Sequence, residues 1–399
     1  MTSPLVCILK PNSTDIRLAV DYRYVNGFTL PDPVGPSDIL SVIQRIGRSN
    51  YITTFDGKSS FWTIPLKPED RWLSAFLCDA GEFQWTRAAF GLKNSGSSFI
   101  RMLSKILQPI RHFAASFVDD CAIYSNTWED HLQHVDNFLQ VIKDSGLTLT
   151  LKKSEYAQPE VKFCGQLVGS GTRRIDPARL KPVNELRRPE TKKQVRQILG
   201  LFGWYRDYIP LFAEIARPLT DLTAKGKPNR VKWSDVEQRS FDSLKESLNT
   251  AISQPLHIID WSLPFNIFAD ASDLIVAGAL SQTDKLDHER PIAFYSKKLN
   301  ATQRAWSTIE KEAFAVLEAL KRFETFIFGH EIHVFSDHNP LSYLTTSAPN
   351  SAKLLRWSLA LQSFNVKFHY KAGKSNAMIV PDCLTRLGPG NNDGESSYT

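Results

Sequence analysis

One segment constrains the architecture of this chain more than any other: Phe113-Ala114-Ala115-Ser116-Phe117-Val118-Asp119-Asp120-Cys121-Ala122-Ile123-Tyr124. It places two adjacent carboxylates between two apolar, strand-like runs, which predicts a β-hairpin with the acidic pair at its turn. Adjacent carboxylates repel each other, so ionising both in one site is costly unless a divalent cation lies beside them. A lone Asp-Asp pair is more often an exposed acidic turn, so the surrounding sequence has to decide between these interpretations.

A third carboxylate, Asp56, ends another apolar run at residues 51–56, and an aromatic residue, Phe61, follows five positions later. Three aspartates at the ends of two neighbouring strands can hold two Mg²⁺ ions for in-line phosphoryl transfer. The surroundings therefore favour a metal site over an exposed turn.

Asp56 together with Phe117-Val118-Asp119-Asp120 resembles the polymerase site of reverse transcriptases, whose usual form is aromatic-x-Asp-Asp. Residues 17–26 resemble the first finger motif of these enzymes, Phe90-Gly91-Leu92-Lys93-Asn94 resembles their gypsy-type loop, and residues 161–165 resemble their primer grip. These motifs narrow the resemblance to retroviruses and gypsy-type long-terminal-repeat retrotransposons.

The resemblance implies roles for residues around the predicted polymerase site. Lys10 and Arg17 would clamp the triphosphate of the incoming nucleotide, a task that needs paired cations aimed at phosphate. Phe61 would be the steric gate that leaves no room for a 2′-hydroxyl, and Val118 would contact the primer end. From the residues alone, the two cations are solvated loop charges and Phe61 is a core aromatic. The remaining implied positions are Phe90 and Gly91 at the nucleotide, and Phe163, Cys164 and Gly165 in the primer grip.

Residues 191–206 begin with a Thr cap signal and predict an amphipathic helix. Gly200 and Trp204 lie four apart, on one helical face, and the resemblance places the same pair in a thumb helix that lies in the minor groove of the duplex. A helix–helix contact is the alternative for Trp204. Three basic neighbours would contact phosphates without reading sequence: Lys192, Lys193 and Arg196.

A second set of carboxylates lies towards the C-terminus. Residues 265–272 and 334–338 predict strands that carry Asp270 and Asp337. Residues 306–323 predict a helix that carries Glu312, with five apolar residues facing inward: Ile309, Ala313, Val316, Leu317 and Leu320. These three acids predict a second metal site.

The same region resembles ribonuclease H domains, whose first three acidic positions match Asp270, Glu312 and Asp337. The frame at residues 373–386 implies Asp382 as the fourth acid. Tyr370 matches the position where gypsy-type enzymes carry a tyrosine in place of an active-site histidine. The neighbouring His369 is expected to be an ordinary strand residue.

Composition and charge limit the remaining possibilities. A chain of 399 residues with 42% hydrophobic and 23% charged residues is globular and long enough for several domains. Taken alone, a net charge of +6 and a pI near 8.9 are weak evidence that the chain binds nucleic acid. A dense basic cluster favours a polyanion partner over a solvated face: Arg173, Arg174, Arg179, Lys181, Arg187, Arg188, Lys192, Lys193 and Arg196.

The five cysteines are scattered, odd in number and never spaced as Cys-x-x-Cys, which disfavours a zinc site and a disulfide framework. The chain is therefore expected to be intracellular and reduced. Neither a membrane-spanning run nor a signal peptide is apparent in the sequence.

The expected fold is a multidomain α+β and α/β protein, a right-hand polymerase followed by a ribonuclease H-like domain. The predicted segments are fingers and palm at 1–170 with shortened fingers, thumb at 171–225, a linker at 226–262, a ribonuclease H-like domain at 263–388 and a disordered tail at 389–399.

The resemblance implies RNA-directed and DNA-directed DNA polymerase activity with ribonuclease H cleavage, both dependent on two Mg²⁺ ions per site, with Mn²⁺ as a substitute. The implied partners are an RNA template, a DNA primer, RNA–DNA hybrids and deoxynucleoside triphosphates, and a homodimer or other Pol products. The implied location is a cytoplasmic virus-like particle and later the nucleus. Two alternatives remain open, namely a decayed or domesticated copy that only binds nucleic acid, and a protein with ribonuclease H activity alone.

Overall fold

The computed structural model describes residues 2–9, 16–35, 38–57, 60–336 and 352–370. The chain divides into two compact units, Met1–Arg173 and Arg174–Thr399. Each unit combines helices with sheets, as expected for an α+β or α/β chain. The separate thumb, linker and ribonuclease H-like segments stay predictions, because residues 174–399 form one compact unit.

The first unit contains a small finger sheet with the strand order β2-β1-β4-β5. Strands β1 (Ser3–Leu9) and β2 (Ile16–Val20) form an antiparallel pair, in register from Leu5↔Val20 to Leu9↔Ile16. Strand β4 (Phe76–Cys78) runs parallel to β1, and β5 (Gly81–Phe83) completes the edge. Lys10 lies outside the described residues, whereas Arg17 lies in β2 opposite Ile8.

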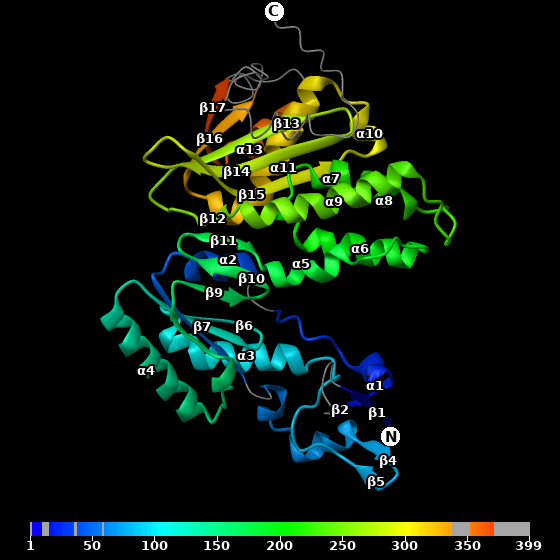
Figure 1. The fold of residues 1–399 in the computed structure, drawn as a ribbon, viewed down its shortest axis with the longest axis vertical. Coiled ribbons are helices and arrows are strands. Elements are labelled where there is room, and N and C mark those ends of the chain that lie inside the picture. Colours follow the sequence, from blue (N-terminus) through cyan, green and yellow to red (C-terminus); the bar gives the residue numbers. More distant parts are fainter. Residues whose placement is uncertain (1, 10–15, 36–37, 58–59, 337–351, 371–399) are drawn as a thin grey trace, which may run out of the picture. The chain divides into compact units, whose positions relative to one another are not determined.

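The larger sheet of the first unit, the palm sheet, has the strand order β6-β7-β3-β8. Its strands are β6 (Ala114–Phe117), β7 (Asp120–Ser125), β3 (Tyr51–Asp56) and β8 (Glu155–Gln158). Helices α3 (Ser95–Leu107) and α4 (Trp128–Ser145) pack on it around a shared core (Figure 1). This core is aromatic and aliphatic, with Phe55, Phe99, Phe113, Phe138 and Ile142 among its buried members.

Helix α4 begins at Trp128 because Thr127 caps it by accepting a hydrogen bond from the Asp130 N–H. It ends at Gly146, whose φ of +72° suits a glycine C-cap. Phe138 and Ile142 are buried in the palm core, whereas the side chain of Leu139 is 39% exposed.

The second unit begins with a helical layer built on one hydrophobic core. Thr191 and Gln194 form a capping box at the start of α6 (Lys192–Trp204), which confirms the expected helix. Ser234 and Glu237 form a second capping box at the start of α9 (Asp235–Ser253). Two shorter helices share this core, α5 (Pro177–Asn184) and α8 (Arg217–Leu222).

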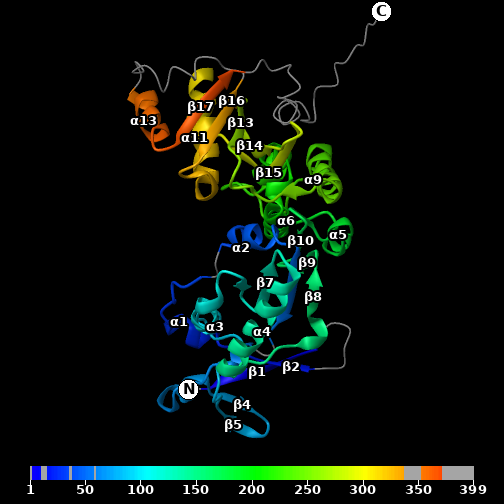
Figure 2. The ribbon, with the colours of Figure 1, turned by 90° about the vertical axis from the view of Figure 1, so that its left-hand side faces the viewer.

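The rest of the second unit is built around a five-stranded sheet with the order β15-β14-β13-β16-β17 (Figure 2). Its strands are β15 (Glu289–Lys298), β14 (Ile275–Thr283), β13 (Phe265–Ala271), β16 (Glu331–Ser336) and β17 (Asn365–Tyr370). β13 pairs antiparallel with β14 and parallel with β16. The strand expected at 265–272 is therefore confirmed.

Helix α11 (Thr308–Ile327) packs closely on β13 and β14. A Cβ at Gly278 would lie 3.0 Å from the Ala319 Cβ, so the helix and the sheet meet at van der Waals distance there. Four of the five apolar residues expected to face inward are buried, but Ile309 is 38% exposed and was wrongly included. Ser307 and Glu310 cap the helix, which moves its start to Thr308.

The opposite face of this sheet is covered by a segment that lies far upstream in the sequence. Leu211 is buried against Phe268, Ala277 and Phe335. Ala277 and Ala279 flank Gly278 on β14, so they point away from α11. The Ala213 N–H also donates to the Ser296 Oγ at 2.9 Å, which fixes the segment to β15.

One member of the expected basic surface cluster is a core residue instead. Arg173 in β11 (Thr172–Ile175) is only 2% exposed, because it alternates with Ile175 on the inward side of the strand. Arg179, Arg187 and Lys193 are exposed as expected. Among the described residues, no helix is both long and apolar enough to cross a lipid bilayer.

Candidate active sites

The predicted hairpin exists and forms the centre of the first candidate site. β6 and β7 pair up to Phe117↔Asp120, so Val118 and Asp119 form a two-residue turn. Val118 adopts φ +53°, which is strained for a β-branched residue and typical of functional turns. The Gly57 N–H donates to the Asp119 carbonyl at 3.1 Å, which ties the turn to the end of β3.

The register of the palm sheet brings the third carboxylate to the same place. β3 pairs antiparallel with β7, and the last pair of the ladder is Asp56↔Asp120. Directly opposed residues in an antiparallel sheet have Cβ atoms about 4.5–5.5 Å apart. Asp56, Asp119 and Asp120 therefore lie together at one edge of the sheet, as the sequence predicted.

The electrostatics of this edge reflect the crowding of negative charge. The pKa of Asp120 is raised by burial first and then by the negative charges of Asp56 and Asp119. Burial also raises the pKa of the neighbouring Cys121 thiol to about 12, with further contributions from Asp120 and Asp119. A cation at this edge would relieve the repulsion.

A lysine that the sequence analysis did not single out already supplies one positive charge here. The Lys153 Nζ donates to the Asp56 Oδ2 at 3.1 Å. The only signal in the sequence was the pair Lys152-Lys153, and a surface lysine pair has no pattern that names a partner almost a hundred residues away. Lys153 also partly offsets the rise in the pKa of Asp120.

The three carboxylates offer the oxygen ligands that Mg²⁺ prefers, and their shared edge suits a divalent ion. In the part of the chain that the structure describes, no three acidic, histidine or cysteine side chains converge as a ready-made metal site. The donor set therefore fits a divalent metal, but the side chains have to rotate to chelate it.

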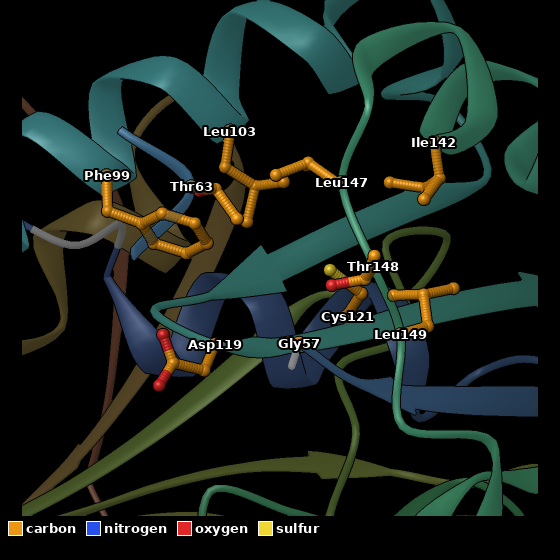
Figure 3. Close-up of a pocket in the computed structure, with 10 residues that line it drawn as sticks. All are labelled: Gly57, Thr63, Phe99, Leu103, Asp119, Cys121, Ile142, Leu147, Thr148 and Leu149. Atoms are coloured by element: carbon orange, nitrogen blue, oxygen red, sulfur yellow. The ribbon is translucent and has the colours of Figure 1, made fainter. Parts of the chain in front are cut away.

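A small pocket extends from Asp119 into the palm core (Figure 3). Asp119 lies at one end with its carboxylate pointing away from Ile142 and Leu149, and Gly57 lies between Asp119 and Leu149. The other lining residues are mainly apolar: Thr63, Phe99, Leu103, Cys121, Leu147 and Thr148. The acidic edge is thus supported from behind by packed side chains.

The predicted primer-grip residues form a second tight hairpin. β9 (Glu160–Phe163) pairs with β10 (Gln166–Gly169), and the turn residues Cys164 and Gly165 have φ of +51° and +78°. Two consecutive positive φ values are typical of a type I′ turn. Burial raises the pKa of Cys164 to about 12 with a contribution from Asp120, so the turn lies within electrostatic reach of the carboxylates. Phe163 itself is a core residue, 1% exposed.

The predicted gate residue Phe61 is half-buried at the edge of the palm core. Its ring lies edge-on to Phe90 at 5.1 Å and to Phe99 at 6.0 Å between centroids. Phe99 belongs to the core. The ring of Phe61 is therefore held by its neighbours, an arrangement that suits both a gate and a packing role.

The Phe90–Asn94 loop is fixed to the finger motif by hydrogen bonds. The Asn26 Nδ2 donates to the Gly91 carbonyl at 2.8 Å, and the Lys93 N–H donates to the Asn26 Oδ1 at 2.8 Å. Gly91 has φ +95°, and a Cβ there would lie 3.2 Å from the Val20 carbonyl oxygen. Only glycine suits this position. Of the predicted phosphate clamp, Lys10 lies outside the described residues and the side chain of Arg17 is not described.

On α6, the predicted pair Gly200 and Trp204 lies on an open face. The Trp204 side chain is 55% exposed, and a Cβ at Gly200 would meet nothing within 4 Å. In contrast, Lys192 and Arg196 donate to the Ala224 and Thr223 carbonyls, 2.9 and 3.3 Å away, just beyond the end of α8. These two cations thus have a structural contact that the sequence analysis did not anticipate. A groove beside α6 is lined by Leu186, Arg187, Arg188, Pro189, Gln194, Gln197, Ile198 and Leu201.

The second candidate site is described only in part. Asp270 lies near the end of β13, where its Oδ1 accepts a hydrogen bond from the Ala271 N–H at 2.8 Å. Glu312 is 4% exposed on α11, the helix that packs on β13. Asp337 and Asp382 lie outside the described residues. Tyr370 ends β17 opposite Ser336, and its side chain is 58% exposed.

His369 is a strand residue, as expected, and stacks on His333 and Phe335.

The thiols of Cys7, Cys78, Cys121 and Cys164 are free.

Two family profiles match the chain. Residues 8–168 match the family described as "Reverse transcriptase (RNA-dependent DNA polymerase)". Residues 260–364 match the family described as "RNase H-like domain found in reverse transcriptase". The two matches contain the two candidate sites, apart from Tyr370 and Asp382.

Individual relatives agree with this division. The chain is 32% identical over 393 residues to the retrovirus-related Pol polyprotein from transposon opus of Drosophila melanogaster, covering 95% of this chain and 39% of the relative. It is 31% identical over 382 residues to the Pol polyprotein from transposon gypsy of the same organism, covering 93% of this chain and 36% of the relative. The chain thus spans well under half the length of these curated relatives.

A solved structure supports the fold. A foamy viral protease–reverse transcriptase in complex with double-stranded DNA superposes with a TM-score of 0.83 at 25% identity, covering 93% of this chain and 65% of that one. Together with the two family matches, this likeness confirms the expected multidomain polymerase fold with a ribonuclease H-like domain.

Proposed function

We propose that this chain, which matches the reverse transcriptase and ribonuclease H-like family profiles and is similar to retrovirus-related Pol polyproteins of transposons, copies RNA into DNA and cleaves the RNA strand of the resulting hybrid. The proposed polymerase activity rests on one observation, the pairing of Asp56 with Asp120 beside the Val118–Asp119 turn.

In this proposal Asp56, Asp119 and Asp120 hold two Mg²⁺ ions at the edge of the palm sheet. Bound there, the ions would supply Lewis acidity at the primer 3′-hydroxyl and charge neutralisation at the triphosphate. The residues themselves fix the position of the negative charge, because the tight turn and the β3–β7 ladder leave the carboxylates little freedom of backbone movement.

The remaining polymerase residues would handle substrates. Lys10 and Arg17 would hold the triphosphate, and Phe61, supported by Phe90 and Phe99, would reject the 2′-hydroxyl of a ribonucleotide. The open face of α6 with Gly200 and Trp204 would lie in the minor groove of the duplex. The turn at Cys164 and Gly165 would support the primer end beside the carboxylates.

The nuclease half would use Asp270 and Glu312 with Asp337 and Asp382 to hold two further Mg²⁺ ions, with Tyr370 beside them. Such a site has to sense the 2′-hydroxyl and the groove shape of the hybrid rather than its sequence. The position of Glu312 supports this role, because it is 4% exposed on α11, the helix that packs on the strand carrying Asp270.

The polymerase half is tested by Mg²⁺-dependent extension of a DNA primer on an RNA template. We expect extension by the parent chain and none by Asp119→Asn. Asp136→Asn is the matched control, since Asp136 is an exposed acid on α4 of the same unit, and it should extend normally.

The nuclease half is tested in parallel by cleavage of an RNA–DNA hybrid, which Asp270→Asn should abolish and Asp119→Asn should not. Cleavage without extension would favour a ribonuclease H-only protein. Loss of both activities in a folded chain that still binds duplexes would favour a non-catalytic copy, and would overturn the proposal.

The proposal also includes deoxynucleoside triphosphates as substrates, Mn²⁺ as a substitute metal, a homodimer or other Pol products as protein partners, and a cytoplasmic particle, with a later nuclear stage, as the location. The resemblance to Pol relatives supports these partners. Light scattering of the purified chain with and without a primer–template duplex would detect the dimer.

A further inference from the structure

Lys153 is placed at the polymerase carboxylates by its backbone as well as by its charge. The Thr150 N–H donates to the Asp56 carbonyl at 2.8 Å, and Leu149 forms a bridge with Gly57. The Lys153 N–H then donates to the Thr150 carbonyl at 3.1 Å, closing the short helix Leu151–Lys153. The position of the Lys153 Cα beside β3 is therefore fixed by main-chain bonds rather than by the ion pair.

The side chain of Lys153 is anchored much less firmly than its backbone. It is 67% exposed, while the Asp56 side chain is 30% exposed. A lysine ammonium is a compact charge on a flexible stem. The ammonium can therefore leave Asp56 for solvent without moving the sheet.

A divalent ion at Asp56 would compete with this ammonium. The ammonium already lies at the Asp56 Oδ2, and two cations at one carboxylate repel each other. The absence of a converged three-acid arrangement among the described side chains agrees with an Asp56 that is turned towards Lys153.

We propose that Lys153 is the internal counter-ion of Asp56 in the metal-free enzyme, and that a divalent ion has to displace it to bind. This inference rests on the proposed polymerase function and adds to it a positioning residue. Lys153 lowers the metal affinity of the site and keeps Asp56 compensated when no metal is bound.

The size of the effect follows from the exposure of the pair. Exposed ion pairs contribute little, so removing the ammonium should tighten metal binding by about two- to five-fold rather than by orders of magnitude. The difference should shrink as salt rises, because screening weakens the pair.

The test is a titration of Mn²⁺ into the full chain without nucleic acid, followed by electron paramagnetic resonance of the free ion. All proteins carry Asp270→Asn, so that the nuclease site contributes less to the signal. The component that disappears with the further change Asp56→Asn belongs to the palm. We expect Lys153→Met to tighten this component about two- to five-fold and Lys153→Arg to leave it near the parent value.

The matched control is Lys152→Met, which removes a charge from the same short helix. It should change Mn²⁺ binding less than Lys153→Met does, because the described ion pair of Asp56 is with Lys153. Equal effects of the two methionine variants, or weaker binding by Lys153→Met, would overturn the inference while leaving the polymerase site intact. A parent chain with no palm component would overturn the proposed polymerase site, and this inference with it.

Discussion

The two carboxylate sites are built by different means. The palm site comes from one tight hairpin and one strand beside it, and main-chain bonds such as Gly57 N–H to the Asp119 carbonyl define it. The proposed ribonuclease H-like site would combine a strand aspartate, Asp270, with Glu312 on a buried helix face, and the sheet that carries Asp270 is covered by Leu211 from a distant segment. The palm site should therefore tolerate side-chain changes without loss of structure, whereas the nuclease site should depend on packing far from its acids.

The largest expected effect concerns the acids themselves. Asp120→Asn should reduce primer extension by about 10³-fold, since a bound metal contributes several kcal/mol to such a reaction. The same change should raise the thermal midpoint of the first unit at neutral pH. The folded state raises the pKa of Asp120 and so disfavours its charge, which the amide removes.

Calorimetry and primer extension on one preparation would check both halves of this prediction. Glu312→Gln is the counterpart in the nuclease site, and it should lose hybrid cleavage while extension stays at the parent level. A fall in the midpoint of Asp120→Asn would contradict the view that the palm backbone holds its carboxylates against repulsion.

The next effect concerns the packing behind the nuclease site. Leu211→Ala should destabilise the second unit by about 2–5 kcal/mol, the usual range for a buried leucine, because Leu211 is 3% exposed against the sheet face that carries Phe268 and Phe335. Alanine does not relieve the left-handed backbone at this position, where φ is +53°. Hybrid cleavage should therefore become more heat-sensitive than primer extension.

Leu201→Ala is the control for this prediction, since Leu201 is 38% exposed on α6. It should cost less than the change at Leu211 when unfolding is followed in urea. If both variants lost the same stability, the buried contact of Leu211 would not be what covers the sheet.

The sequence was sufficient where structure depends on neighbours along the chain. The alternation around Asp119 and Asp120 predicted the hairpin, and the Thr191 cap predicted the start of α6. The strand that ends near Asp270 followed from the same kind of pattern.

The sequence was insufficient where tertiary packing decides. Leu139 and Ile309 have helical spacing but lie beyond the edge of the buried stripe, and Arg173 is buried although its type favours the surface. The contact of Leu211 with Phe335 and the ion pair of Lys153 with Asp56 join residues roughly a hundred positions apart, which no local periodicity encodes.

A smaller effect should appear when pH is lowered. Burial lowers the pKa of His131, which lies between Thr53 and Ser125 with hydrogen bonds of 2.8 and 3.0 Å behind the palm strands. A lowered pKa in the folded state means that the unfolded chain binds the proton more readily. His131 therefore supports the fold fully above its ordinary pKa of 6.5 and loses that contribution as pH falls below it.

Urea unfolding of the first unit at pH 7.5 and pH 5.5 would measure this loss, and His131→Gln should reduce the difference between the two. His134 acts in the same direction, because burial also lowers its pKa. The His134 Nδ1 shares a hydrogen bond of 2.8 Å with the same Ser125 hydroxyl. The stability of the His131→Gln variant should therefore still depend somewhat on pH. Stability that rises on acidification in this range would refute the assignment.

The smallest expected effect tests what holds the upstream segment on the nuclease sheet. Lys298 on β15 pairs with Asp221 on α8, but the side chains are 35% and 54% exposed. Such pairs usually contribute about 0–1 kcal/mol, far less than the apolar contact of Leu211. Lys298→Met should therefore change the urea midpoint of the second unit only slightly, and the difference from the parent should vanish at high salt. A loss as large as that of Leu211→Ala would mean that charge rather than burial holds the segment, and the contrast between a palm site defined by backbone bonds and a nuclease site defined by apolar packing would then fail.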